Sequence, residues 1–518
     1  FYPINYAFNF SHNARPWLFL ATKVSLHTFD YEQNSFLFTE LLKKDLKISC
    51  CQYSSLGTYL AIGTKSGTLY IMDSITLQLE LADTFDYSKG RITHICFSSN
   101  SNYLATADEK LAVTVYSKSD ENKWQFLGKI IKHFKPITGL LFYDNGRNFH
   151  ASLLSLGEDR YLVEYDPITS TLFNLTLKNT YIVEQSAIPR SIDWYPSFTS
   201  EKFLITCNSD FKIRLYNSVT KMCRGTFLGP VFGEPLSSIK VVPRESLPKV
   251  KHHRYLAFSC RHKIGLQILP PTGNPYESVA MIGHPFDVMD FVLSFDGIYM
   301  FTSDGKSVIK WKINSSFLES VYALGGADLS PFLELLVTKD GMDIYDLLQK
   351  VFYFFIIHER ESRAKKTENK LPISYIPHLM RALGFYPTEK QIEDMVNEVQ
   401  YRHFETVGAL SLLIDFDTTL KLFINHRPFL GIKMKDVERS FEVLGDMKKD
   451  TFSRLLKTEG EKMSENEVQD CFAILCKEDS PRKIPLETED ITAKMFSASK
   501  KFPKVINAQT FVEDILRF

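Results

Sequence analysis

The sequence predicts a multidomain protein in which an all-β propeller of seven blades is followed by an all-α region. Two observations support this fold class. An apolar strand that leads into a polar turn recurs seven times over the first three-fifths of the 518 residues, and repeats of this length are typical of propellers with four-stranded blades. From about Asp343 the apolar residues change from alternation to helical spacing, which indicates helices.

Composition is that of an ordinary globular protein. Hydrophobic residues make up 44% and charged residues 24% of the chain, and 61 basic residues balance 61 acidic ones. This balance gives no electrostatic reason to expect a nucleic acid or an anionic membrane as partner. The eight cysteines include no CxxC pair, so we predict neither a disulfide nor a zinc site, and no cofactor. The chain begins at Phe1 inside a strand-like segment, and we expect it to be part of a longer protein.

The seven repeats occupy residues 1–318. In each repeat, three predicted strands follow one another, and the third strands end 43 to 52 residues apart, close to the period of WD-repeat blades. These ends lie near Phe29, Met72, Tyr116, Tyr165, Tyr216, Ile268 and Trp311. Through this phase, the Gly283–His284 pair and Trp311, the repeats resemble WD40 propellers.

Aspartates precede the third strand in four repeats, at Asp108, Asp159, Asp210 and Asp304. Matching positions favour a structural role, in which each carboxylate ties a tight turn to neighbouring backbone, over a catalytic one. The sequence also lacks GxxxxGK, GxSxG and HExxH motifs, so we do not expect an enzyme.

A basic cluster lies in an extended loop of the propeller, at residues 243–256. Two interpretations remain open: a solvated loop, or a contact with an acidic partner surface. Adjacent side chains on an extended segment point in opposite directions, which argues against a metal site at the histidine pair. The candidate contact residues are Lys249, Lys251, His252, His253 and Arg254.

After a connector at residues 319–342, we expect two helical lobes, at residues 343–426 and 427–518. An eighth blade near residues 339–346 is the alternative, but no turn signal for a further strand follows. The stretches MRALGFYPTEKQIEDMVNEV, LLKTEGEKMSENEVQDCF and VINAQTFVEDIL resemble calmodulin at three correctly ordered places. This resemblance implies two lobes, each with a pair of EF-hands.

The calcium ligands of such hands are missing. An EF-hand loop ends in a bidentate glutamate, but here the matching positions hold Tyr375, Thr418, Thr451 and Thr510. The second loop begins with Gln400 and Arg402 and carries an insertion, the third is too short, and a long insertion from about residue 477 to 504 splits the fourth. We therefore predict degenerate hands without a metal, kept as a fixed apolar clamp and not as a calcium switch.

The stretches LGGADLSPF, LMRALGFYPTEKQIEDM, NHRPFLG and SFEVLG resemble the cilia- and flagella-associated protein 251 family. Membership implies a non-enzymatic scaffold of the ciliary or flagellar axoneme and cytoskeleton. Its implied place is the calmodulin- and spoke-associated complex, at the base of the third radial spoke beside the nexin-dynein regulatory complex. Its implied partners are spoke proteins, doublet tubulin and, as a further candidate, calmodulin. The alternatives are a calcium- or calmodulin-responsive regulator of spoke signalling and a generic WD40 adaptor.

Overall fold

We describe a computed structural model of the chain. It describes residues 8–516, apart from residues 11–16, 22–24, 42–46, 120, 145–150, 199, 244–253, 327, 337–343, 363–368, 403, 405–407, 432–433, 477–502 and 504. By their contacts the residues form two compact units. Residues 1–387 and 391–427 make the first unit, and residues 388–390 and 428–518 make the second.

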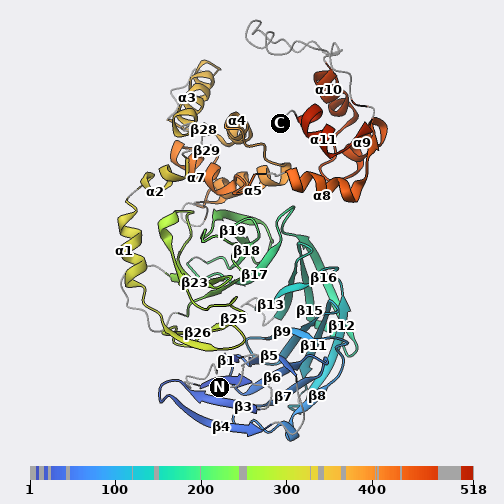
Figure 1. Ribbon diagram of the computed structural model, residues 1–518, viewed down its shortest axis with the longest axis vertical. Helices are drawn as coiled ribbons and strands as arrows, with labels where there is room; N and C mark the ends of the chain where they lie inside the picture. Colours follow the sequence, from blue (N-terminus) through green and yellow to red (C-terminus); the bar gives the residue numbers. More distant parts are fainter. Residues whose placement is uncertain are drawn as a thin grey trace. The chain divides into compact units, whose positions relative to one another are not determined.

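The first unit contains seven antiparallel sheets, six of four strands and a last one of three described strands (Figure 1). The first three sheets are β1 (Phe8–Phe10), β2 (Trp17–Ala21), β3 (Ser25–Asp30) and β4 (Ser35–Leu41); β5 (Ile48–Tyr53), β6 (Tyr59–Thr64), β7 (Leu69–Asp73) and β8 (Asp83–Phe85); and β9 (Ile92–Phe97), β10 (Tyr103–Asp108), β11 (Ala112–Lys118) and β12 (Trp124–Ile131).

The remaining sheets follow the same order along the chain. They are β13 (Ile137–Asp144), β14 (Ala151–Gly157), β15 (Tyr161–Thr171) and β16 (Asn174–Ile182); β17 (Pro189–Trp194), β18 (Phe203–Asn208), β19 (Lys212–Asn217) and β20 (Cys223–Leu228); β21 (Ser238–Val241), β22 (Arg254–Cys260), β23 (Lys263–Leu269) and β24 (Ser278–Ile282); and β25 (Asp290–Leu293), β26 (Tyr299–Ser303) and β27 (Val308–Lys312).

The sheets are the blades of a closed ring. The first strand of each sheet contacts the first strand of the next, and β25 of the last sheet contacts β1. Leu18 and Leu20 of the first sheet pack with Val292 and Phe301 of the last, which closes the ring with apolar contacts. The predicted seven-bladed propeller is confirmed, and each of the seven predicted third-strand ends lies in the third strand of its sheet.

Buried polar networks explain the surviving signature residues. The His284 ring contacts the Thr302 hydroxyl at 2.7 Å and Asp304 at 3.5 Å, and the Trp311 indole N–H donates to the same hydroxyl at 2.8 Å. The network therefore links four segments of the last blade. A comparable buried network in the fourth blade consists of His133, Ser155, Asp159 and Tyr165.

The structural interpretation of the repeated aspartates is confirmed at three of the four positions. Asp108 accepts the backbone N–H of Ala112 at 2.9 Å, and Asp304 accepts the N–H groups of two residues in its own turn. Asp159 accepts the backbone N–H of Phe134 at 3.0 Å.

Helices replace strands after the last blade. The connecting segment forms α1 (Ser316–Leu324), α2 (Ser330–Leu333) and η3 (Glu334–Leu336). The first helical group follows, with α3 (Ile344–Ser362), β28 (Leu371–Pro372), η4 (Ile373–Tyr375), α4 (Ile376–Ala382), α5 (Glu389–Tyr401), β29 (Leu413–Ile414) and α7 (Phe416–His426). The second helical group has α8 (Met434–Leu444), β30 (Met447–Lys448), α9 (Lys449–Thr458), α10 (Glu465–Cys476), β31 (Val505–Ile506), α11 (Ala508–Thr510) and η5 (Phe511–Leu516).

The two helical groups share one order of elements: helix, short strand, helix, helix, short strand, helix. In each group the two short strands pair in antiparallel fashion, and the registers match. Leu371 pairs with Ile414 in the first group, and Met447 pairs with Ile506 in the second. All four of these side chains are buried, so each strand pair forms part of its group's apolar core.

Among the described residues, no helix is long and apolar enough to cross a membrane. The apolar run from Val351 to Ile357 lies within α3. Helical spacing places its side chains on two faces of α3: Phe352 and Ile356 are buried, whereas Phe354 and Ile357 are exposed.

Candidate protein-interaction site

Most of the predicted basic loop lies outside the described residues. This applies to Lys249, Lys251, His252 and His253. Arg254 is described, and it begins β22, where it pairs with Leu269 of β23. The loop therefore stays a prediction.

The four predicted calcium-loop ends lie close to the start of a helix, just after a short strand. Tyr375 lies in η4 before α4, Thr418 in α7, Thr451 in α9 and Thr510 in α11. Tyr375 uses its hydroxyl to donate a 2.7 Å hydrogen bond to Glu359 of α3. This hydrogen bond joins η4 to α3.

Two of these positions serve helix capping. Asp415 accepts the backbone N–H of Thr418 at 2.8 Å, and Asn507 accepts that of Thr510 at 2.9 Å. The Thr510 hydroxyl in turn accepts the backbone N–H of Asn507 at 2.8 Å, which completes a reciprocal cap. Asp415 therefore caps α7, and Asn507 and Thr510 together cap α11.

Cationic side chains lie beside the second loop, around a cavity of about 370 Å³. The cavity is lined in part by Lys370, Arg402, Asp415 and Thr418, and the Arg402 guanidinium donates to the Thr418 hydroxyl. Burial raises the pKa of the Asp415 carboxyl, but hydrogen bonds from Thr418 and the charges of Arg402 and Lys370 outweigh burial and hold the pKa below its usual range. Positive charge here opposes a divalent cation.

The described residues contain no group of three or more His, Cys, Asp or Glu side chains placed to hold a metal ion. Two places stand out, one inside the first unit and one inside the second.

The first helical group is joined to the propeller along β20, the outermost strand of the fifth blade. An outer strand leaves backbone N–H groups without a partner strand. Thr226 donates its N–H to Glu398 of α5, and Leu228 donates its N–H to Asn425 of α7, both at 3.0 Å. Figure 1 shows α5 and α7 next to this blade. We name the region where these helices meet the propeller the helix–propeller junction.

Charged and aromatic side chains strengthen the helix–propeller junction. Arg214 of the propeller lies 3.3 Å from Glu184 and 3.5 Å from Asp394 of α5. Burial disfavours the charged guanidinium, but the nearby carboxylates outweigh burial and raise the pKa of Arg214. The Arg224 guanidinium also stacks on the Tyr401 ring of α5, 3.7 Å from its centre, which adds a cation–π attraction.

A loop of the sixth blade completes the helix–propeller junction. Asn425 donates from its side-chain amide to the Thr272 carbonyl at 3.0 Å. Gly273 follows with φ +86°, and a Cβ built there would lie 1.9 Å from the Asn425 side-chain oxygen, so glycine is required for this approach. Glu277 accepts two hydrogen bonds from Thr272, and its burial raises its pKa to about 7.

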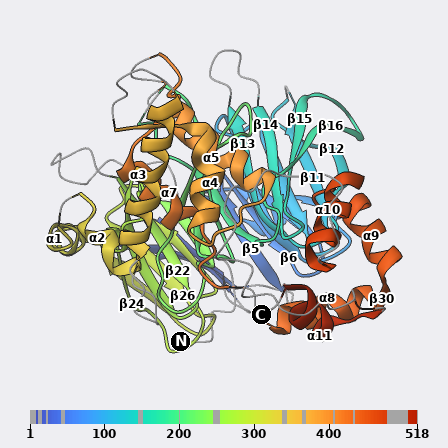
Figure 2. The same cartoon turned by 90° about the horizontal axis from the view of Figure 1, so that it is seen from above.

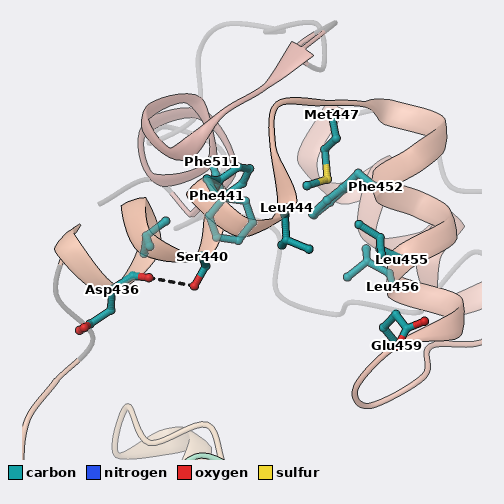
Figure 3. A pocket seen from close by; sticks show the side chains of 11 residues that line it. Asp436, Ser440, Phe441, Leu444, Met447, Phe452, Leu455, Leu456, Glu459 and Phe511 are labelled. Carbon is teal, nitrogen blue, oxygen red and sulfur yellow. Dashed lines mark hydrogen bonds between the residues drawn. The ribbon is translucent and has the colours of Figure 1, made fainter.

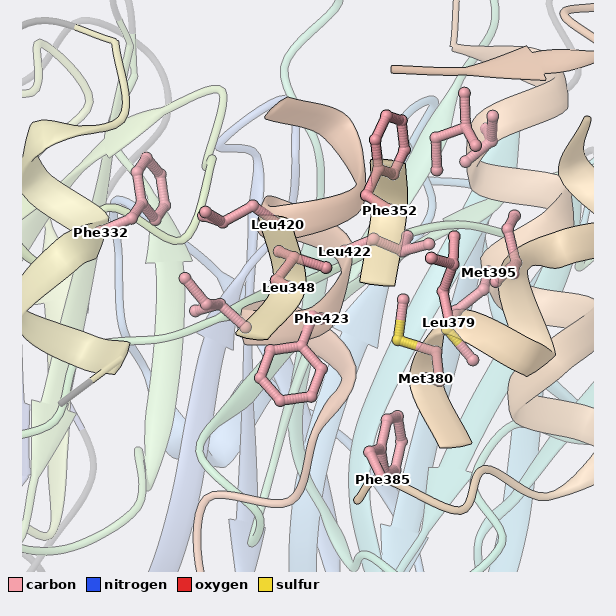
Figure 4. Close-up of a cluster of buried hydrophobic side chains, with 14 of the residues drawn as sticks. Phe332, Leu348, Phe352, Leu379, Met380, Phe385, Met395, Leu420, Leu422 and Phe423 are labelled. Carbon is pink, nitrogen blue, oxygen red and sulfur yellow. The ribbon is translucent and has the colours of Figure 1, made fainter. Parts of the chain in front are cut away.

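The apolar interior of the first helical group is filled by other parts of the same chain. Figure 4 shows Phe332 of α2 beside side chains of this group. Phe211 and Leu228 of the propeller and Leu336 of η3 belong to the same buried cluster. The prediction that an apolar groove clamps a partner is therefore wrong for the first helical group, because propeller and connector residues belong to its apolar cluster. The predicted lobe core is confirmed: Leu379, Leu383, Ile392, Met395, Val396 and Val399 all pack in this cluster.

The second helical group instead has an open cleft of about 860 Å³ between α8 and α9 (Figure 3). We name it the α8–α9 cleft. Leu444 is 54% exposed, and α8 and α9 contain no buried residue. The cleft is lined by Asp436, Val437, Ser440, Phe441, Leu444, Met447, Phe452, Leu455, Leu456, Glu459 and Phe511.

Comparison with known proteins identifies relatives over nearly the whole chain. The family model described as "CFAP251 C-terminal domain" matches residues 343–516. "Cilia- and flagella-associated protein 251" of Mus musculus is 36% identical over 509 residues, which are 95% of this chain and 39% of the mouse protein. The chain belongs to the cilia- and flagella-associated protein 251 family.

Two further relatives carry the same name. The protein of Pongo abelii is 36% identical over 95% of this chain and 44% of its own length, and that of Tetrahymena thermophila is 29% identical over 91% and 52%. The chain thus spans about two-fifths to one-half of the curated family members named here. Its localisation is ciliary or flagellar, as the family name states.

The contacts that join the helices to the propeller were not identified from the sequence. Glu398 and Asn425 are separated by 172 and 197 residues from their partners on β20, so no local pattern connects them. One signal was available for Asn425, because it begins the NHRPFLG stretch that carries part of the likeness to the family.

Proposed function

We propose that this member of the family is a non-enzymatic scaffold of the axoneme at the base of a radial spoke. There it holds spoke and dynein-regulatory components on the doublet microtubule for ciliary motility. Family membership carries this proposal. The structure supports an architectural role, because buried contacts make the propeller and the first helical group one compact unit.

The helical region supports the proposal as a pair of EF-hand-like lobes that have lost the metal. Each group contains two helix–strand–helix units joined by a strand pair. Caps, a tyrosine and cations take the places of calcium ligands. Such lobes hold one conformation without an ion to open or close them.

Imaging of the tagged protein in native cilia tests the proposed place. We expect density at the spoke base, and a position elsewhere on the axoneme would contradict the proposal. The basic loop is tested in the same cilia with the triple change Lys249→Glu, Lys251→Glu and Arg254→Glu.

We expect the triple loop variant to assemble at the spoke base in reduced amount, because tubulin presents an acidic surface to it. The control reverses three exposed cations elsewhere on the propeller, with Lys89→Glu, Arg91→Glu and Lys110→Glu. Equal assembly of both variants would remove the loop from the docking surface.

Calorimetric titration of the full chain with calcium chloride separates the scaffold from a calcium-responsive regulator. We expect no heat of binding at micromolar calcium. A micromolar isotherm would favour the regulator and contradict the fixed lobes.

A further inference from the structure

The cavity beside the predicted second calcium loop combines cations with an aliphatic wall. We name this cavity of about 370 Å³ the second-loop cavity. It lies wholly within the first compact unit. Figure 2 shows α5 and α7 close together, and the hydrogen bond from Arg402 to Thr418 joins the end of α5 to the start of α7. The cavity is lined by Lys370, Val399, Arg402, Leu410, Ser411, Leu412, Leu413, Asp415 and Thr418.

The charged lining residues give the second-loop cavity an excess of positive charge. Lys370 and Arg402 are cations, whereas Asp415 is the one carboxylate among the lining residues. That carboxylate already caps α7, where it accepts the backbone N–H of Thr418. Among the described residues, the Arg402 guanidinium makes a single hydrogen bond, to the Thr418 hydroxyl, and no ion pair. Its other N–H donors therefore remain for an anion.

Aliphatic side chains form a wall beside these charges. Leu410, Leu412 and Leu413 are 44% to 62% exposed, so they present apolar area that the first helical group does not cover. The backbone holds this wall in place: Leu413 pairs with Pro372 across the two short strands, and the Leu412 carbonyl accepts the N–H of Ile373 at 3.1 Å. A wall fixed in this way needs little rearrangement to receive a ligand.

This arrangement favours a ligand whose negative charge and apolar group lie close together. The C-terminal residue of a peptide meets this requirement, because its carboxylate and its side chain leave the same Cα atom. An aspartate or glutamate side chain carries a charge without an apolar group on the same residue. The volume of about 370 Å³ is near the lower end of the range of binding pockets, so it suits one terminal residue better than a long segment.

We propose that the second-loop cavity binds the C-terminal carboxylate of a partner protein whose last residue is aliphatic. The Arg402 guanidinium binds the carboxylate through charge-assisted hydrogen bonds, Lys370 adds positive charge, and the three leucines contact the terminal side chain. The position predicted for a second calcium loop thus accepts an anion. This site goes beyond the proposed scaffold function, because the contact does not depend on where in the cilium the chain lies.

The test measures binding of short peptides to the full chain by fluorescence anisotropy. The probe is fluorescein-labelled Gly-Ser-Gly-Ser-Val-Leu with a free C-terminal carboxylate. We expect saturable binding that weakens by about tenfold when the same peptide ends in an amide, because the amide is uncharged. A third peptide, Gly-Ser-Glu-Val-Gly-Ser with an amide end, carries an internal carboxylate and should also bind about tenfold more weakly.

Two variants change the charge of the second-loop cavity in opposite directions. Arg402→Gln removes the guanidinium and should weaken binding of the free-acid peptide by about tenfold. Asp415→Asn keeps a side-chain oxygen that caps α7 but removes a negative charge beside the ligand, so we expect binding about threefold tighter. Both side chains are exposed, so both variants should fold. The control is Arg381→Gln, which removes an exposed cation of α4 outside the cavity and should leave binding unchanged.

The aliphatic wall is tested separately. Leu412→Ser removes apolar area from an exposed position and should weaken binding of the free-acid peptide by about fivefold. The same loss is expected when the peptide ends in glycine, because glycine has no side chain to contact the wall.

Several results would overturn the inference. One is the absence of saturable binding of the free-acid peptide, and another is equal binding by the unchanged chain and by Arg402→Gln. Equal binding of the free acid and the amide would show that the carboxylate is not recognised. Equal binding of the peptide with the internal glutamate would assign the cavity to acidic side chains in place of a chain terminus. None of these readouts depends on position in the cilium, so the peptide inference and the spoke-base proposal can fail separately.

Discussion

The two helical groups have the same order of elements but differ in how their apolar faces are covered. In the first, Leu379, Met380 and Leu420 are fully buried in a cluster that also contains propeller and connector residues. In the second, the side chains of α8 and α9 line an open cleft. The comparison teaches that a helical pair of this kind fixes its own backbone but leaves one apolar face to be covered by something else. In the first group, segments that precede it in the same chain contribute to the cluster that buries this face.

The largest expected effect on stability comes from shortening the side chains at Met380 and Leu456, each the tenth residue from the start of the first short strand in its group. Met380→Ala should lower the free energy of unfolding by about 2–5 kcal/mol, because it leaves a cavity in a filled core. Leu456→Ala should cost less than about 1 kcal/mol, because that side chain borders an open cleft. Urea unfolding of both full-length variants measures the difference. Equal costs would show that the second cleft is covered in the free protein.

The helix–propeller junction predicts a difference between two glycines that both have positive φ. Gly273 approaches Asn425 closely, whereas no atom lies within 4 Å of a Cβ built at Gly384. Gly273→Ala should therefore destabilise the first unit by about 2 kcal/mol more than Gly384→Ala, which only adds backbone strain. Thermal unfolding of the two variants measures this. A smaller effect at Gly273 would show that the loop or the Asn425 side chain can move to make room for the added methyl group.

The pH dependence of stability should differ between the two compact units. Burial raises the folded-state pKa of Glu277 to about 7 from its usual 4.5, so its contribution is complete below pH 4.5 and is lost as pH rises toward 7. We expect the free energy of unfolding of the first unit to fall by about 3 kcal/mol over this interval, because each unit of pKa shift corresponds to about 1.4 kcal/mol. In the second group, the backbone N–H and hydroxyl of Ser464 lower the pKa of Glu467, which gives the opposite sign.

Glu277→Gln is the test of this slope. The variant should show a flatter dependence of unfolding on pH between 4.5 and 7, measured by urea titration at each pH. An unchanged slope would assign the pH dependence to another group.

The smallest effect concerns the stacked pair at the helix–propeller junction. Tyr401→Leu keeps apolar volume but removes the aromatic face beneath Arg224, so we expect a loss of about 0.5–1 kcal/mol. Tyr386→Leu is the matched control, because that tyrosine is 76% exposed. Chemical unfolding compares the two, and an equal loss would mean that the stacking contributes nothing to the joint.

The sequence by itself determined the seven blades, their phase and the presence of a helical region after them, although helices already begin at Ser316, before the predicted start near Asp343. These features repeat locally: alternation marks strands, 3.6-residue spacing marks helices, and the third strands end 43 to 52 residues apart. It also determined that Tyr375, Thr418, Thr451 and Thr510 offer no carboxylate. Each of these inferences depends on neighbours along the chain.

Only the tertiary structure decided what each helical group contacts. The bonds from Glu398 and Asn425 to β20 join residues that are far apart in sequence, and the need for glycine at position 273 arises from a helix that follows much later. Periodicity shows that a helix has an apolar face, but it does not show what covers that face. Burial depends on which surfaces meet in space, and this is why the apolar cluster of one group includes other parts of its chain, whereas the described residues of the other line an open cleft.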